Sequence, residues 1–105
     1  MQGRCAICGR ENLEVTKHHL VPKSQIRRIS RRRKVSPFQL RNDIVWTCLA
    51  CHGHIHSVLS EKELADSFYT LELLVSQEDV SKFVDWVSKR PAGRKIRHRR
   101  IRARM

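Results

Sequence analysis

Cysteines occur in this sequence as two pairs with the spacing of metal-binding knuckles. They are Cys5 with Cys8 and Cys48 with Cys51, two Cys-x-x-Cys pairs far apart along the chain. Four thiolates in two knuckles match the closed tetrahedral site that zinc prefers. With sulfur at all four positions zinc keeps no open coordination position, so we expect it to stabilise the fold rather than to act on a substrate.

Free buried thiols, disulfides and a redox Cys-x-x-Cys motif are the alternatives for these cysteines. A thioredoxin-like redox motif needs a βαβ context that is missing here, and it would not occur twice. No apolar run follows residues 1–4, so we expect neither a signal peptide nor a transmembrane segment. A cytoplasmic location follows, and its reducing conditions favour a metal over disulfides.

Histidines supply the remaining candidate metal chemistry. The ones close to the predicted strands are His18, His19, His52, His54 and His56. His52 and His56 are four residues apart on a predicted helix, so both side chains point to one face and can share an ion. His18 and His19 are adjacent, which in a regular strand sends them to opposite faces. Both serve one site only if the strand ends there or a substrate phosphate lies between them, with one as ligand and one as base.

Two short strands are expected to carry these residues. Residues 13–21 are rich in β-branched side chains and roughly alternate, which predicts a strand, and residues 42–47 predict a second strand that leads into the second cysteine pair. Between them, residues 23–41 are too charged to be core, and we expect an irregular arm. Phe38 is predicted to attach the end of this arm to the domain.

Helices are expected in the second half of the chain. One starts at His52, and residues 60–63 form a capping box ahead of apolar residues that continue at helical spacing to Val75. Residues 76–79 start another helix in the same manner, and the two last helices are predicted to pack as a hairpin. Residues 91–105 are rich in arginine and show no period, so we expect a tail that is disordered until it meets a partner.

Positive charge points to a polyanionic partner. The net charge is +12, and the basic residues concentrate in residues 27–34 and 89–105. Such blocks attract nucleic acid, because each phosphate that they neutralise releases counterions. A membrane surface is the weaker alternative, since the tail lacks a bulky apolar face. Trp46 and Trp86 lie among aliphatic neighbours, so we expect core packing rather than base stacking.

The arrangement of these residues resembles the HNH endonucleases, whose small ββα-metal motif is a β-hairpin packed on a helix. The matching string is Cys5-x-x-Cys8, His18-His19-Leu20-Val21-Pro22, Asn42 and Cys48-x-x-Cys51-His52-x-x-x-His56. The similarity covers about residues 5–59. The resemblance implies an α+β fold with a zinc-stabilised ββα-metal motif in residues 1–59, a helical hairpin in 60–90 and a basic tail in 91–105.

The resemblance also implies an activity, the metal-dependent hydrolysis of DNA to 3′-hydroxyl and 5′-phosphate ends. By position, His19 is the general base. His18, His52 and His56 hold the catalytic divalent ion, although members of the family differ in whether the last position is used. Asn42 is the middle letter, which ties the loop between the strands and so steadies the base. Three histidines suit manganese, nickel or zinc, while magnesium prefers oxygen ligands.

The stretch between His19 and Asn42 is longer than in compact members of the family. Its basic residues are Arg27, Arg28, Arg31, Arg32, Arg33 and Lys34. We expect them to contact the phosphates of double-stranded DNA, against the alternative of a solvated loop. The rival functions are a zinc-ribbon module that binds DNA or RNA without cutting it, and an RNA-binding protein with a degenerate nuclease core. The zinc-ribbon module does not explain the histidines and the asparagine at HNH positions, and removal of the basic tail would distinguish the RNA-binding alternative.

Overall fold

Three antiparallel strands form a small sheet in the computed structural model, which describes residues 2–91. The strands are β1 (Gln2–Gly3), β2 (Leu13–His19) and β3 (Ile44–Cys48), in the spatial order β1, β2, β3. The β2–β3 register places His18 opposite Val45 and His19 opposite Ile44. The strand predicted over residues 13–21 is shorter in the structure, and the two histidines are its last residues.

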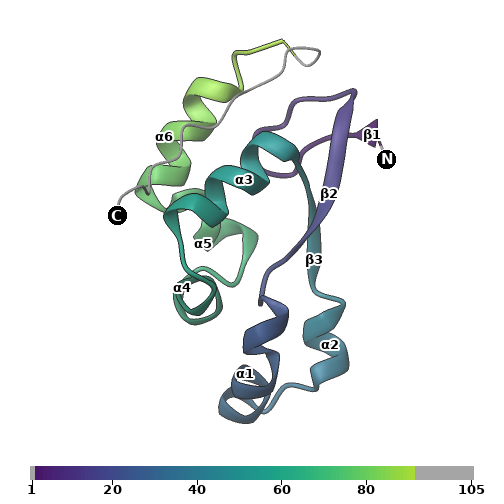
Figure 1. The fold of residues 1–105 in the computed structure, drawn as a ribbon, viewed down its shortest axis with the longest axis vertical. Helices are drawn as coiled ribbons and strands as arrows, with labels where there is room; N and C mark the ends of the chain where they lie inside the picture. Colours follow the sequence, from purple (N-terminus) through teal and green to yellow (C-terminus); the bar gives the residue numbers. More distant parts are fainter. Residues whose placement is uncertain (1, 92–105) are drawn as a thin grey trace.

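Helix α3 (Leu49–Val58) begins directly after β3 and lies against the sheet. Its first residues are capped by Cys48, whose Sγ accepts a hydrogen bond from the Cys51 N–H at 3.4 Å. The helix therefore starts at Leu49, earlier than the start at His52 that the sequence pattern predicted. The pattern missed this start because the cap is a cysteine rather than one of the usual capping residues. Figure 1 shows α3 between the sheet and α6 (Glu78–Val87), and it contacts both.

Residues 23–41 are largely helical, and the prediction of an irregular arm is wrong. They contain a 3-10 turn, η1 (Lys23–Gln25), followed by α1 (Ile26–Arg33) and α2 (Pro37–Arg41). Arginine is a good helix former, and Ile26 and Ile29 give α1 one buried face beneath its charged surface. Figure 1 shows α1 and α2 side by side at one end of the molecule.

A small second core joins this helical arm to the rest of the protein. Its buried members are Val21, Ile26, Ile29, Leu40 and Ala65. Leu40 attaches α2, with 6% of its surface exposed, whereas Phe38 is 70% exposed. The expectation for Phe38 is therefore wrong, because Leu40 occupies the inner face of α2 instead.

The C-terminal part contains α4 (Glu61–Ser67), α5 (Leu71–Ser76) and α6. The capping box at the start of α4 is present: Ser60 Oγ accepts from the Glu63 N–H, and the Glu63 carboxylate accepts from the Ser60 N–H. The helix does not continue to Val75 as predicted, because Thr70 caps a new helix, α5. The predicted hairpin is formed by α5 and α6.

The main core extends from the cysteine pairs to α6, so the helices after residue 60 share it. Its buried residues are Cys5, Ile7, Leu13, Cys48, Ala50, Cys51, Ile55, Leu59, Leu64, Leu74, Val80 and Val87. Trp86 is 46% exposed and packs against Arg90, so its predicted place in the core is wrong. The inner face of α6 is occupied by Val80 and Val87 instead. Trp46 is half-buried and belongs to neither core.

Within residues 2–91, no helix has the length and apolar character needed to cross a membrane. The fold is a small α+β arrangement in which α3 packs against an antiparallel sheet, α6 packs on α3 and α5 packs on α6. The predicted disordered tail, from residue 92 on, and His98 lie outside the described residues.

Candidate metal centres

The cysteines form one cluster where the N-terminal knuckle, the end of β3 and the start of α3 meet. All their Sγ atoms lie within 4.8 Å of one another. The Sγ atoms of Cys8 and Cys48 are 3.9 Å apart, and no disulfide links any of the cysteines. Four sulfurs at about 2.3 Å from a tetrahedral zinc ion lie roughly 3.8 Å from one another. The cluster therefore has the spacing of a structural metal site such as zinc.

Backbone N–H groups and one arginine surround these thiols. The N–H groups of Ile7 and Cys8 point at Cys5 Sγ, at 3.3 and 3.4 Å. The buried Arg10 guanidinium donates to Cys8 Sγ and Cys48 Sγ, both at 3.4 Å. The pKa of Cys8 is lowered, first by the neighbouring thiols Cys48 and Cys5 and also by Arg10. Positive charge and N–H donors stabilise thiolates, the form that binds metal.

Arg10 is a residue of this site that the sequence reasoning missed. Four thiolates and one divalent ion leave an excess of negative charge, which a buried guanidinium partly balances. Its position two residues after Cys8 is the only sequence signal for this role. A basic residue just beyond a Cys-x-x-Cys knuckle is therefore worth testing as a charge partner of the metal site.

A second cluster brings together His18 of β2 with His52 and His56 of α3. Their nearest ring nitrogens lie within 4.8 Å of one another, and the ring centroids are 4.9 to 5.4 Å apart. His18 is 1% exposed, and neither of its ring nitrogens has a hydrogen-bond partner among the described residues. Buried imidazole nitrogens are normally hydrogen-bonded or bound to a metal, so this arrangement fits a metal ligand.

Thr16 orients one of these histidines from β2. Its Oγ1 lies 2.8 Å from His52 Nδ1 and 3.5 Å from the carbonyl oxygen of Thr47. When the His52 ring carries its proton on Nδ1, the hydroxyl accepts from Nδ1–H and keeps its own proton for the Thr47 carbonyl oxygen. This tautomer leaves the lone pair of His52 Nε2 available for a metal ion. The sequence reasoning did not identify Thr16, although it lies two residues before His18 on the same strand face.

Burial keeps the clustered histidines neutral. It lowers the pKa of His18 to about 4, with further contributions from the nearby His52, His56 and His19. Burial also lowers the pKa of His52 and of His56. Neutral imidazole is the form that binds divalent metal, so at pH 7 these residues are in the state that a metal site needs.

His19 ends β2 next to this cluster but is not part of it. It is half-buried, and burial followed by the charges of Lys23 and Lys17 lowers its pKa. Burial lowers the pKa of His52 first, and the charges of His56 and His19 lower it further. A neutral histidine beside a metal site is in the protonation state of a general base. Lys23 is a further residue near the site that the sequence reasoning did not single out.

Asn42 lies in the connection between the strands, directly after α2 and two residues before β3 begins. Its side-chain Nδ2 donates to the Phe38 carbonyl oxygen at 2.8 Å. Next to Asn42, the two ends of this connection are joined by a hydrogen bond, in which the Leu20 N–H donates to the Asp43 carbonyl oxygen at 3.1 Å. Among the described residues, no hydrogen bond joins Asn42 to His19. The Asn42 side chain thus ties the end of α2 to the start of the same helix.

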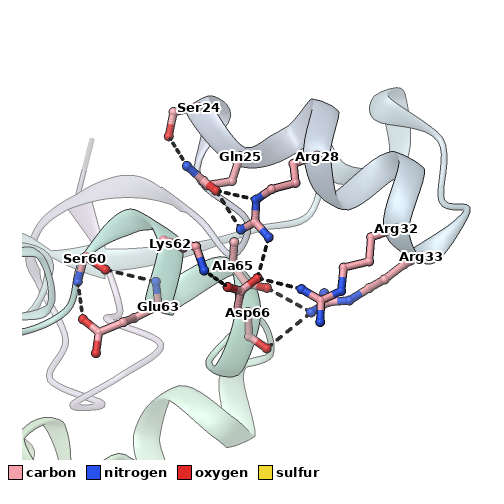
Figure 2. Close-up of polar contacts among 10 residues, drawn as sticks. All are labelled: Ser24, Gln25, Arg28, Arg32, Arg33, Ser60, Lys62, Glu63, Ala65 and Asp66. Carbon is pink, nitrogen blue, oxygen red and sulfur yellow. Dashed lines mark hydrogen bonds and ion pairs between the residues drawn. The ribbon is translucent and has the colours of Figure 1, made fainter.

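The six basic residues chosen from the sequence do not share one environment. Figure 2 shows Arg28, Arg32 and Arg33 reaching from α1 toward α4. Arg28 and Arg32 pair with Asp66 at 2.9 and 3.5 Å. Arg33 donates to the carbonyl oxygen of Ala65 at 3.0 Å. These three side chains dock α1 on α4, whereas the remaining basic positions of the segment, 27, 31 and 34, are exposed.

Comparison with known proteins gives one relationship. No protein-family model matches this sequence, and no solved structure matches it. The uncharacterized protein YisB of Bacillus subtilis is 30% identical over 95 residues, which cover 90% of this chain and 83% of YisB. The chain belongs to the same family as YisB.

Proposed function

We propose that this protein is a metal-dependent DNA endonuclease of the HNH type. The observation that carries the proposal is the histidine cluster, in which the ring nitrogens of buried His18 have no partner and lie beside His52 and His56. His19 adjoins this cluster as a neutral base. A bound divalent ion accounts for an unsatisfied buried imidazole next to two further imidazoles better than side-chain packing alone does.

The arrangement of the elements also supports the proposal. The antiparallel pair β2–β3 with α3 packed against it has the order of a ββα-metal motif. The first strand of the pair carries His18 and His19, and the helix carries His52 and His56. The cysteine cluster clamps the end of β3 and the first turn of α3, and so orients the helix that presents two of the ligands.

Each residue then has a distinct part in phosphodiester hydrolysis. His18, His52 and His56 would hold the divalent ion, with manganese, magnesium or nickel as candidates. Such an ion, when bound, stabilises the charge that develops on the phosphate and on the departing 3′ oxygen. His19 takes the proton from the attacking water. The products would carry a 3′-hydroxyl and a 5′-phosphate.

Plasmid nicking by the purified protein tests this proposal. We expect cleavage that depends on added manganese, magnesium or nickel and that falls by orders of magnitude in His19→Ala. His54→Gln is the matched control, since His54 is also on α3 but stacks on Phe83 at 4.1 Å instead of joining the cluster. Zinc content and thermal melting should stay close to wild type in both variants.

Two outcomes would contradict the proposal. Cleavage that persists in His19→Ala would remove the assigned base. Binding of DNA without cleavage in every metal would favour the zinc-ribbon module, a protein that uses its basic surface to bind nucleic acid and has no catalytic site.

A further inference from the structure

The exposed face of the α1–α2 arm carries a basic groove. It has a volume of about 530 Å³, and its charged lining residues are Lys23, Arg27, Arg31 and Arg41. No acidic residue lines it. In the part of the chain that the structure describes, none of these four side chains forms an ion pair. Four uncompensated cations around one groove have the chemistry of a phosphate-binding surface.

The helical geometry of α1 separates two sets of arginines. Arg27 and Arg31 are four residues apart, so they share one helix face, which is the face lining the groove. Arg28 and Arg32 form the neighbouring pair and turn toward Asp66 on α4. Asp66 also pairs with Lys62 at 3.0 Å. The negative charge of Asp66 is therefore taken up by Arg28, Arg32 and Lys62, and it does not pair with Arg27 or Arg31. The first pair therefore keeps its full charge for a ligand, while the second pair holds the helix in place.

The position of the groove relates it to the histidine site. Lys23 lines the groove, lies four residues after His19 in the sequence, and helps burial to lower the pKa of that histidine. The lining includes no aromatic side chain, so the groove lacks the stacking platforms that bind unpaired bases. It suits a continuous phosphate backbone rather than a single strand with exposed bases.

We infer that the groove between α1 and α2 binds the phosphodiester backbone of duplex DNA next to the cleavage site, through Lys23, Arg27, Arg31 and Arg41. The choice of DNA as the polyanion rests on the proposed function. The groove adds Lys23 and Arg41 to the contacts expected from the sequence and removes Arg28, Arg32 and Arg33 from them. Because its contacts are to phosphates, it contributes affinity and salt dependence without reading sequence.

The salt dependence of binding tests this inference. Fluorescence anisotropy of a labelled DNA duplex, without added divalent metal, gives the affinity of the full chain over a series of salt concentrations. Each lost phosphate contact lowers the slope of log K against log salt by about 0.9, so Arg27→Gln/Arg31→Gln should lower it by about 1.8. Between 50 and 200 mM salt, the wild type then loses roughly 12-fold more affinity than this double variant.

Arg28→Gln/Arg32→Gln is the matched control, because it removes the same charge from the same helix. Lys82→Gln/Lys89→Gln, at exposed positions in and after α6, serves if the first control melts early. The controls should keep the wild-type slope. Equal losses in all variants would mean diffuse attraction by net charge and would overturn the inference, as would an unchanged slope in Arg27→Gln/Arg31→Gln or tighter binding of an RNA duplex of the same sequence.

Failure of the nuclease proposal gives a different result. A wild-type protein that binds duplex DNA with the expected variant slopes but never cuts it would refute the nuclease and leave the groove in place. A wild-type protein that cuts, with the same slope in every variant, would refute the groove alone.

Discussion

Replacing Thr16 with valine removes one hydrogen bond at the histidine cluster and leaves the strand otherwise intact. Valine has the shape of threonine and a high β-propensity, so β2 should form as before. The change deletes the 2.8 Å contact between Thr16 Oγ1 and His52 Nδ1, which orients the imidazole. A histidine without its outer partner binds metal about 10- to 100-fold more weakly, or about 1.4 to 2.7 kcal/mol.

Thr47→Val is the control for this experiment. Thr47 is the cross-strand neighbour of Thr16, is fully buried, and has a hydroxyl without a hydrogen-bond partner within residues 2–91. Its substitution also exchanges a threonine for a valine in the same sheet but touches no histidine. Because it removes an unsatisfied polar group, it should leave stability unchanged or slightly raised.

Isothermal titration with manganese or nickel measures the effect, on proteins that carry one equivalent of zinc, enough for the cysteine cluster alone. We expect one weaker divalent site in Thr16→Val and a wild-type site in Thr47→Val, with both variants folded. Equal affinity in all three proteins would refute the role of Thr16 in orienting His52. No binding by the wild type would refute the histidine centre itself.

Three further changes probe the scaffold. Cys48→Ser should lose both bound metal and cooperative melting, since Cys48 is a cluster thiol and also caps α3; a well-folded, metal-free variant would contradict a structural metal site. Ser60→Ala should lower the free energy of unfolding by about 1 kcal/mol in urea titrations, because α4 loses its capping box, and an unchanged midpoint would argue against this cap. The pKa of Asp66 is lowered from its ordinary value by hydrogen bonds from Lys62 and Arg28, so its stabilising contribution is present above that value and is lost as the pH falls through the lower folded-state pKa. The stability difference between wild type and Asp66→Asn should therefore shrink in acid, and a difference independent of pH would contradict the ion pairing.

The sequence determined the local features of this protein. Two Cys-x-x-Cys pairs predicted a single cluster of thiols, which is confirmed, because each knuckle brings its own two sulfurs together and one metal requires four. The spacing of His52 and His56 places both on one helix face, and the capping box at Ser60 starts α4 as predicted. Such features depend on residues within one turn of helix or one strand, so they can be deduced from residue type and spacing.

Charge misled the sequence reasoning at α1. Six basic residues in a short stretch predicted an irregular loop, but two isoleucines three residues apart suffice to bury one face of a helix. A similar limit applies to Trp86, whose aliphatic neighbours on α6 occupy the inner face and leave the indole exposed. Which face of a helix is buried depends on what packs against it.

Only the tertiary structure decided which distant residues meet. Thr16 reaches His52 across 36 residues of sequence, Arg10 reaches Cys48 across 38, and Arg28 pairs with Asp66 on another helix. Hydrophobic burial joins these elements without direction, and polar partners are then selected by whichever groups the packing leaves within hydrogen-bond distance. The residue types that could bind metal can therefore be identified from the sequence. The groups that orient these ligands or balance their charge depend on the packing of β2, α3 and α4.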